Sequence, residues 1–477
     1  MATSVLKKLD RKTTGIKSTR PVKVIQFGEG NFLRAFVDWI IDILNEKTEF
    51  NGSIDVVQPI AQGMGTQIND QDGLYHVVLN GIKDGKPSTE TRLITSLSRV
   101  INPFLDMPSY LKAAENPDLR FVVSNTTEAG IAFNPADKNP NALPDSFPGK
   151  LTVFLHHRFK HFQGVGGKGL IFLPCELIEK NGVNLRQAIL QYADHWRLPE
   201  GFKKWIEQEN TFCNTLVDRI VPGYPKETIQ QIQEGIGYDD KLVVTAEPFH
   251  LWVIEANESV QKVLPAEKAG LQVKFTSDLT PYRTRKVRIL NGAHTALVPV
   301  AYLMGLRTVR DSIDHPVVGK FIRESLFEEI IPTLELSKDE LHQFAHDVIE
   351  RFQNPFIRHE LSSIALNSIS KFKVRVLPSL LRYVEIKNAL PERLVMSLAA
   401  LLQFYKGQWN GESTPVSDSP EIITFFKTAW ANPSLHQVAN IVLSNREFWG
   451  EDLTKVTGLS NAVTNHLESF TRHGKVL

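Results

Sequence analysis

Cysteine is nearly absent from this chain. Only Cys175 and Cys213 occur among its 477 residues, which excludes a disulfide framework and a cysteine-based metal cluster. So little cysteine is typical of proteins in a reducing compartment, and we expect a cytoplasmic protein.

Long apolar runs and an excess of one charge are also missing. No run approaches the ~20 apolar residues that a membrane helix needs, and the polar N-terminus lacks the apolar core of a signal peptide. Lysine and arginine number 54 against 53 for aspartate and glutamate, a net charge of +1, which does not suggest a nucleic-acid surface. We therefore expect no membrane and no nucleic acid as partners.

The chain is long enough for two or three domains, and its predicted secondary structure changes along its length. In the first half, strand-like segments such as KVIQF, RFVVSNT and GLIFLPCEL alternate with helical ones, for example 32–46 and 151–162, which predicts a mostly parallel α/β sheet. A hairpin with Asp84–Gly85 in its turn is predicted within YHVVLNGIKDGKPSTETRLITSL. Beyond about residue 210 long amphipathic segments dominate, so we predict an α/β domain over 1–217 and a mainly helical domain over 218–477.

The stretch VIQFGEGNFLRAFVDWIIDILNE places two glycines, Gly28 and Gly30, between a strand and a helix. This is the geometry of a dinucleotide-binding turn, in which Gly28 allows the tight bend and Gly30 lets a pyrophosphate approach. A third glycine is missing, because Leu33 stands in its place. From these residues alone, a plain tight connection and a nucleotide-binding turn both stay open.

Two nearby positions bear on the ligand. Arg34 either pairs with Asp38 one turn on or reaches a phosphate. The second strand ends in Gln58, where an acidic residue normally binds the adenosine ribose, so this position does not decide between NAD and NADP.

A second chemical signal lies in RKVRILNGAHTALVPVAYLMGL, from Arg285 to Leu306. On a helix, Lys286, Asn291 and His294 would lie along one edge. An amine, an amide and an imidazole suit the reduction of a carbonyl group, since one group donates a proton and the others hold the oxygen. The arginines around Lys286 would favour its neutral form; solvated or capping side chains are the plain alternative.

Five separated motifs resemble the polyol-specific long-chain dehydrogenase/reductase family, whose type member acts on mannitol. They are the GEGNF turn followed by Arg34 and Ala35, CELIEKNG, NTLVDRI, AEPFHLWVIE and KVRILNGAH. The resemblance implies a Rossmann-type N-terminal domain, a helical C-terminal domain and metal-independent hydride transfer with NAD(H).

The resemblance also assigns residues. It implies that Lys286 is the acid/base, that Asn291, His294 and Asn181 bind the reacting oxygen, that Lys371 binds the substrate, and that Asp218 either orients His294 or binds a substrate hydroxyl. It places the turn residues against the cofactor, namely Phe27, Gly28, Gly30, Asn31, Phe32 and Arg34.

Three positions depart from the family pattern. Leu177 replaces one of two asparagines in CELIEKNG, and Arg283 replaces a glutamate linked to proton release. Ser363 replaces an arginine that contacts the polyol, while Lys371, eight residues later, is kept. We read the last change as altered specificity that suits a uronate.

Several motifs are most similar to family members that interconvert tagaturonate and altronate, so the expected partner is a sugar acid. Reduction of fructuronate and oxidation of mannitol remain alternatives within the family, and a non-catalytic dinucleotide sensor is an alternative from another class. The sequence gives no oligomeric state. The carboxylate of a uronate would need a cation, for which Lys371 is the first choice and Arg358 or Arg375 the next.

Overall fold

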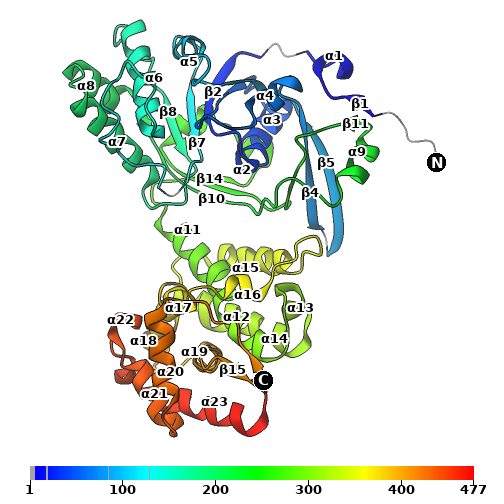
Figure 1. Ribbon diagram of the computed structural model, residues 1–477, viewed down its shortest axis with the longest axis vertical. Coiled ribbons are helices and arrows are strands. Elements are labelled where there is room, and N and C mark those ends of the chain that lie inside the picture. The colour runs from blue at the N-terminus through cyan, green and yellow to red at the C-terminus, as the bar shows by residue number, and fades with distance from the viewer. Residues whose placement is uncertain (1–5, 18–19, 84, 128) are drawn as a thin grey trace. The chain divides into compact units, whose positions relative to one another are not determined.

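The computed structural model describes residues 6–17, 20–83, 85–127 and 129–477. Its contacts divide the chain into two compact units, whose elements Figure 1 labels in chain order. Unit 1 comprises Met1–Asn80 and Ser88–Leu279, and unit 2 comprises Gly81–Pro87 and Thr280–Leu477.

Unit 1 is built on a six-stranded parallel sheet in the order β6-β3-β2-β7-β8-β9. Its strands are β2 (Val22–Phe27), β3 (Ser53–Val57), β6 (Leu97–Ile101), β7 (Phe121–Ser124), β8 (Ile171–Pro174) and β9 (Thr211–Phe212). The order reverses between β2 and β7, as in doubly wound dinucleotide-binding folds, where ligands bind at the carboxyl ends of the strands beside the reversal. The expected Rossmann-type domain is confirmed.

Alternating side chains of this sheet enter two separate cores. Ile25 and Phe27 pack with one set of helices, whereas Val24 and Val56 pack on the other face. The first set is α5 (Met107–Ala114), α6 (Phe147–His161), α7 (Asn181–His195) and α8 (Glu200–Glu209); the other face is covered by α3 (Val37–Lys47). Figure 1 shows α6, α7 and α8 on one side of the sheet and α3 on the other.

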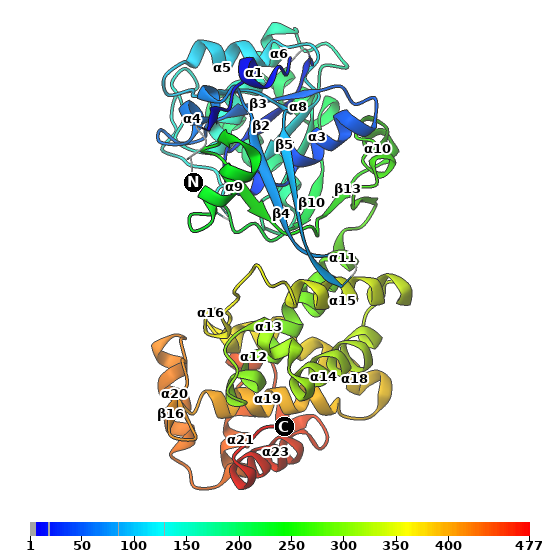
Figure 2. The same cartoon turned by 90° about the vertical axis from the view of Figure 1, so that its right-hand side faces the viewer.

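Two three-stranded sheets complete the α3 side of unit 1. One has the order β12-β4-β5, made of β12 (Val244–Ala246), β4 (Tyr75–Lys83) and β5 (Lys86–Ile94). The other has the order β10-β13-β14, made of β10 (Asn214–Asp218), β13 (Leu251–Glu255) and β14 (Val273–Thr276). The predicted hairpin is present as β4 and β5, drawn as long paired strands in Figure 2; Asp84 of its predicted turn lies outside the described residues.

Because of these sheets, the boundary between the two units lies later in the chain than the sequence predicted. Val217, Trp252 and Ile254 belong to the same core as Val24 and Ile40, so the segment 218–279 packs with unit 1. The predicted boundary after residue 217 therefore falls inside unit 1, and the contacts divide the chain after Leu279. Shorter elements of unit 1 are β1 (Lys7–Lys8), α1 (Arg11–Thr14), α2 (Asn31–Arg34), α4 (Gly65–Asp70), α9 (Ile229–Ile236), β11 (Tyr238–Asp239), α10 (Glu258–Val263) and η1 (Glu267–Ala269).

Unit 2 is largely helical, as expected. Its centre is α12 (Gly292–Leu303), which is apolar on nearly every side and contacts α13, α14, α16, α17 and α19, as a helix in the middle of a core must be. The remaining elements are α11 (Thr280–Arg285), η2 (Lys286–Asn291), α13 (Val309–Asp314), α14 (Pro316–Glu324), η3 (Ser325–Ile330), η4 (Ile331–Thr333), α15 (Lys338–Phe352), α16 (Leu361–Ile364), α17 (Ser368–Arg375), α18 (Leu377–Lys387), α19 (Glu392–Phe404), β15 (Gln408–Trp409), β16 (Glu412–Ser413), α20 (Pro420–Trp430), α21 (Leu435–Leu443), α22 (Arg446–Trp449), η5 (Leu453–Lys455) and α23 (Leu459–His473).

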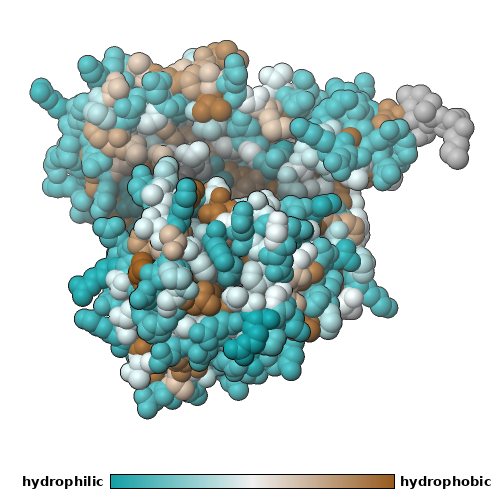
Figure 3. All heavy atoms as spheres, turned by 60° about the horizontal axis from the view of Figure 1, so that its bottom comes forward, coloured by the Kyte–Doolittle hydropathy of each residue, from teal (hydrophilic) through white to brown (hydrophobic). Residues whose placement is uncertain are grey.

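Hydrophilic residues predominate on the face turned forward in Figure 3, with hydrophobic residues scattered among them. Among the described residues, no helix has both the length and the apolar composition needed to cross a bilayer.

Candidate functional site

The glycine turn follows β2 directly. Gly28 has φ +120°, a left-handed conformation that favours glycine, and a Cβ there would lie 3.3 Å from Leu33 Cδ1. Gly30 has the ordinary φ of −68°, and a Cβ on it would have no heavy atom within 4 Å. The space outside Gly30 is therefore open, which fits the close approach of a pyrophosphate group.

The helix after the turn is not continuous. The predicted helix over 32–46 is divided into α2 and α3, because Phe36 leaves helical geometry with φ −126° and ψ −76°. Phe32 stacks on Phe36 with ring centroids 5.0 Å apart. The first main-chain N–H groups of α2 have no partner within that helix, as at any helix N-terminus.

The residues predicted to contact the cofactor differ in how far their side chains are exposed. Asn31 is exposed and Phe32 is half-buried. The side chain of Phe27 is fully buried against Tyr110 and Phe147, so only its main chain reaches the turn.

Arg34 is not a surface cation, because its side chain lies inside unit 1 and joins parts of the main chain. Its guanidinium is buried and donates to the carbonyl oxygens of Glu29 and Leu242 and to Asn31 Oδ1 at 2.7 Å. Arg34 thus binds main-chain groups on both sides of the turn and also interacts with Asp38 electrostatically, and its role as a phosphate ligand stays a prediction.

A buried carboxyl group lies beneath the same turn. Asp38 Oδ2 accepts a hydrogen bond from the Tyr75 hydroxyl at 2.9 Å, and Gln26 Nε2 donates to the Gly28 carbonyl at 3.1 Å. Asp38 Oδ1 and Gln26 Oε1 are both buried, and neither has a donor among the described residues, although the two side chains interact. The hydrogen bonds from Tyr75 and Gln26 favour the charged form of Asp38, whereas burial, the larger effect, favours the neutral form. Burial raises the pKa of Asp38 to about 7.

The loop after β7 forms the other side of the strand reversal, and sequence reasoning missed the residue that holds it. Glu176 is buried and accepts hydrogen bonds from the Ser124 hydroxyl at 3.1 Å and from both the main-chain N–H and the hydroxyl of Thr126 at 3.0 Å. Burial raises the pKa of Glu176. Its place in CELIEKNG, directly after a strand, was the signal that could have identified it.

Among the described residues at the end of β3, neither Gln58 nor Asp55 provides an unpaired carboxylate for a ribose. Gln58 donates to the carbonyl oxygens of Ile60 and Ala61 and accepts from the Gly65 N–H, so its amide closes its own loop. Asp55 pairs with Arg99 at 3.1 Å within the sheet.

The side-chain amide of Asn181 has no N–H group left to donate to a ligand. Its Nδ2 lies 3.0 to 3.1 Å from the carbonyl oxygens of Pro174, Glu176 and Thr215, and its Oδ1 accepts from the N–H groups of Gly182 and Thr215 at 2.9 Å. The amide is thus fully used in joining β8, α7 and β10, and the place of Asn181 among the oxygen-binding residues stays a prediction. Leu177, at the other family position, is 63% exposed.

Asp218 is buried at the end of β10, where its main chain pairs with Leu251. The next residue, Arg219, is also buried and donates to the carbonyl oxygens of Ala35 and Glu247 at 2.8 Å. Burial lowers the pKa of Arg219 to about 9. Arg219 therefore ties the end of β10 to the chain between α2 and α3.

In unit 2 the segment Lys286–Asn291 is a π-helix, η2, inserted between α11 and α12. In an α-helix of 3.6 residues per turn, residues five apart lie about 140° apart around the axis. Hydrogen bonds from i to i+5 instead place Lys286 and Asn291 on the same side. The π turn, which the spacing did not reveal, therefore places Lys286 and Asn291 on one side of the segment.

His294 follows on α12 and is held as a neutral imidazole. Its ring stacks on Phe352 with centroids 4.2 Å apart and lies 5.1 Å from the ring of His359. Burial, then His359, Arg351 and Arg375, lower the pKa of His294 well below its ordinary value. Its Nε2 is buried without a hydrogen-bond partner among the described residues.

The arginines near Lys286 are not equivalent. Arg285 is buried, pairs with Glu340 at 2.9 Å and stacks on Phe344 at 4.3 Å, so its charge is neutralised. Arg288 donates to the Val374 carbonyl oxygen at 2.9 Å, and burial lowers the pKa values of Arg283 and Arg288.

Two cations on α17 lie close to this segment, because α17 contacts both η2 and α12. Lys371 donates to the Ile364 carbonyl oxygen at 2.8 Å, and Arg375 is half-buried with no carboxylate partner among the described ion pairs. Burial lowers the pKa of Lys371, with a further contribution from Arg375. Arg358, by contrast, is exposed and paired with Glu360. Unit 2 thus brings together Lys286, Asn291, His294, Lys371 and Arg375.

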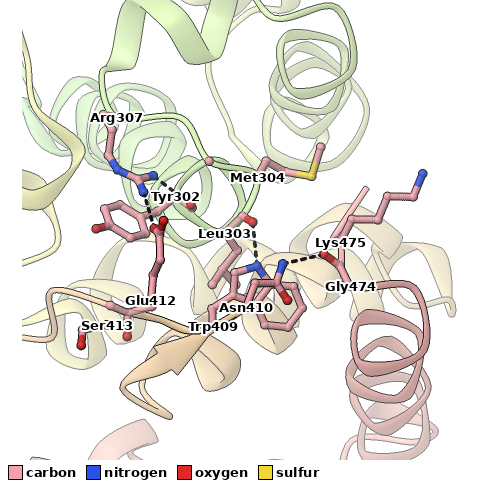
Figure 4. Close-up of a pocket in the computed structure, with 12 residues that line it drawn as sticks. Tyr302, Leu303, Met304, Arg307, Trp409, Asn410, Glu412, Ser413, Gly474 and Lys475 are labelled. Atoms are coloured by element: carbon pink, nitrogen blue, oxygen red, sulfur yellow. Dashed lines mark hydrogen bonds and ion pairs between the residues drawn. The ribbon is translucent and has the colours of Figure 1, made fainter.

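A separate cavity of about 310 Å³ lies at the other end of α12 (Figure 4). Arg307 pairs with Glu412 at 3.2 Å and stacks on Tyr302, and Trp409 Nε1 donates to the Leu303 carbonyl oxygen at 2.8 Å. These polar groups hold β15 and β16 against α12. None of the sequence-predicted site residues lines this cavity.

Comparison with known proteins agrees with this architecture. Residues 22–268 match the family model described as the mannitol dehydrogenase Rossmann domain, and residues 278–471 match the mannitol dehydrogenase C-terminal domain. Altronate oxidoreductase of Phocaeicola vulgatus is 50% identical over 465 residues, which is 97% of this chain and 97% of the relative. Altronate oxidoreductase of Bacillus subtilis is 49% identical over 471 residues, 98% of this chain and 97% of the relative.

Solved structures share the fold at lower identity. D-sorbitol dehydrogenase in substrate-free form superposes with a TM-score of 0.81 at 24% identity, covering 99% of both chains. Pseudomonas fluorescens mannitol 2-dehydrogenase, in a ternary complex with NAD and D-mannitol, gives a TM-score of 0.65 at 23% identity, covering 98% of this chain and 97% of the other.

Proposed function

Because this chain belongs to the mannitol dehydrogenase family of oxidoreductases, we propose that it interconverts tagaturonate and altronate with NAD(H), without a metal ion. The similarity to altronate oxidoreductases over 97% of both chains carries the proposal. The cation-rich surroundings of His294 add to it, because a uronate differs from a polyol by its negative charge.

The dinucleotide fits the open space at the turn of unit 1. Gly28 and Gly30 would admit the pyrophosphate, with main-chain donors from the start of α2, while Arg34, Gln26 and Asp38 keep the turn in shape. The loop that Glu176 holds after β7 would border the other side. When bound, the cofactor supplies a hydride to a ketone or takes one from an alcohol.

Residues of unit 2 would handle the proton. Reduction of a ketone adds a hydride at carbon and a proton at oxygen, and the Lys286 ammonium group would donate that proton and take it back in the oxidation. Asn291, on the same side of the π turn, and His294 Nε2 would hold the oxygen by hydrogen bonds. A neutral His294 suits this role because it adds no competing proton source.

The substrate carboxylate would lie against α17. Burial lowers the pKa values of Lys371 and Arg375, and neither forms an ion pair with a carboxylate among the described residues, although Asp418 acts on Lys371, so a uronate would supply a further anion. Asp218 would bind a substrate hydroxyl. Asn181 would act only as a positioning residue, since its amide is fully bonded. A reducing compartment such as the cytoplasm suits the two buried free cysteines.

The test is NADH oxidation with tagaturonate, fructuronate and D-fructose measured in parallel, with and without a metal chelator. We expect the highest kcat/KM with tagaturonate and no effect of the chelator. Faster turnover of fructuronate or fructose would change the assigned substrate, and binding of NADH without turnover of any of the three would indicate a dinucleotide sensor.

A further inference from the structure

A large cavity of unit 1 lies at the opposite edge of the six-stranded sheet from the glycine turn. Its volume is about 680 Å³, and its lining includes Pro21 and Lys23 at the amino end of β2 and Arg120 and Phe121 at the amino end of β7. Gly28 follows the carboxyl end of β2, so Lys23 and Gly28 are separated by five residues of extended chain, about 16 Å. The cavity is thus distinct from the dinucleotide turn.

The lining of this cavity is strongly cationic. It includes Lys23, Lys47, Arg120, Lys262 and Lys268 against two acids, Glu49 and Asp118. Among the ion pairs of the described residues, only Lys262 of these five has a carboxylate partner, Glu258 at 3.8 Å on the exposed surface. Four cations therefore lie around one cavity without a carboxylate in ion-pair contact.

Two of the cations are held in place by the fold. Lys23 Nζ donates to the Phe50 carbonyl oxygen and lies 5.4 Å from the centre of the Phe50 ring, and Lys47 Nζ lies 3.4 Å from the Ala269 carbonyl oxygen. A carbonyl oxygen satisfies one donor of an ammonium group and leaves two others and the full charge. Val263, 43% exposed, adds an apolar wall.

We propose that this cavity binds a small organic anion with at least two negative charges, such as a phosphate monoester or a polycarboxylate. One charge would leave most of the cations unmatched, whereas a multivalent anion reaches several at once and gains from each. The volume is that of a ligand pocket for a small molecule, and Phe50 with Val263 suits the carbon skeleton. The proposal does not depend on the substrate proposed above.

The test uses isothermal titration of the full chain, saturated with NADH to block the dinucleotide turn, with pyrophosphate and with citrate as probes at about 0.15 M NaCl. The double variant Arg120→Ser/Lys268→Ser removes two exposed cations of the cavity. Lys160→Ser/Lys204→Ser removes two exposed cations of unit 1 that lie on α6 and α8 and do not line the cavity. Circular dichroism checks that both variants are folded.

We expect saturable binding of at least one probe, weakened about tenfold or more by the cavity variant and unchanged in the matched control. Binding of pyrophosphate alone would identify a phosphate ligand, and binding of citrate alone a polycarboxylate. The proposal is overturned if neither probe binds saturably, or if both double variants weaken binding equally, because the effect would then be one of net charge.

Discussion

Gly292 lies against the main chain of Arg375: a Cβ atom on Gly292 would be 3.0 Å from the Arg375 carbonyl oxygen. Gly292 stands between Asn291 and His294, and Arg375 ends α17, which also carries Lys371. The absent side chain therefore lets the cation-bearing helix approach the segment with the proposed acid/base.

The first prediction concerns this contact. Gly292→Ala gains about 1 kcal/mol of helix propensity but forces the Arg375 main chain to move by a few tenths of an ångström. We expect the free energy of unfolding to change little while KM for tagaturonate rises by about tenfold, since small displacements of binding groups are costly. Gly235→Ala on α9, where an added Cβ meets nothing within 4 Å, is the control and should leave KM unchanged. An unchanged KM in both variants would contradict the prediction.

The second prediction concerns proton transfer. Lys286→Ala should lower kcat by ~10²–10⁴-fold, the usual contribution of a general acid/base. Lys286→Arg keeps the charge but cannot release a proton near neutral pH, so it should be nearly as slow. Steady-state kinetics with tagaturonate and NADH measures both. Recovery of activity in the arginine variant would show that charge, rather than proton donation, is what position 286 supplies.

The third prediction concerns the substrate carboxylate. Lys371→Met and Arg375→Met should each raise KM for tagaturonate by about tenfold or more, the loss expected when a charge-assisted hydrogen bond is removed. The Kd for NADH should stay unchanged, as should KM for D-tagatose, which carries a neutral hydroxymethyl group instead. Arg358→Met is the control, because Arg358 is exposed and paired with Glu360. If tagatose and tagaturonate are affected alike, these residues do not bind the carboxylate.

The fourth prediction separates the two glycines of the turn. Gly30→Val has ordinary φ and open space around its Cβ, so the protein should stay folded while the Kd for NADH rises by about 100-fold through the lost approach of the pyrophosphate. Gly28→Val must adopt φ +120° and crowd Leu33, and it should lower the melting temperature. Fluorescence titration and thermal unfolding measure the two effects. Unaltered NADH affinity in folded Gly30→Val would remove the turn from the cofactor site.

The fifth prediction concerns pH. Burial raises the pKa of Asp38 to about 7, above its ordinary value of 3.8. Below pH ~3.8 both folded and unfolded chains hold the proton, whereas between ~3.8 and ~7 only the folded chain does, so this contribution to stability is lost as pH rises to about 7. Asp38→Asn, a neutral mimic of the protonated acid, should lack that loss and be more stable than the parent at pH 8. Denaturant unfolding at pH 5 to 8 measures it, with the exposed Asp70→Asn as control; parallel curves for parent and Asp38→Asn would exclude a protonated Asp38.

Some of this protein could be predicted from the sequence because the responsible interactions are local. The bend at Gly28, the strand before it and the alternation of Val24 with Ile25 between two cores depend on φ angles and on a two-residue period. The same holds for the apolar segment that became α12. Residue spacing also placed Lys286, Asn291 and His294 in one segment.

Other features depended on distant parts of the chain, which no local pattern encodes. Arg34 joins distant parts of the main chain because the Leu242 carbonyl oxygen, 208 residues away, accepts a hydrogen bond from it. Asn181 is fully hydrogen-bonded because Thr215 of β10 lies beside it. The strands up to β14 joined unit 1 because they share a core with α3. The close approach of Arg375 to Gly292 likewise depends on α17 packing against α12. Sequence alone therefore determined which residue types stand at the candidate site, and the tertiary structure decided which of them remain available to a ligand, because buried polar atoms must find their partners wherever the fold brings them.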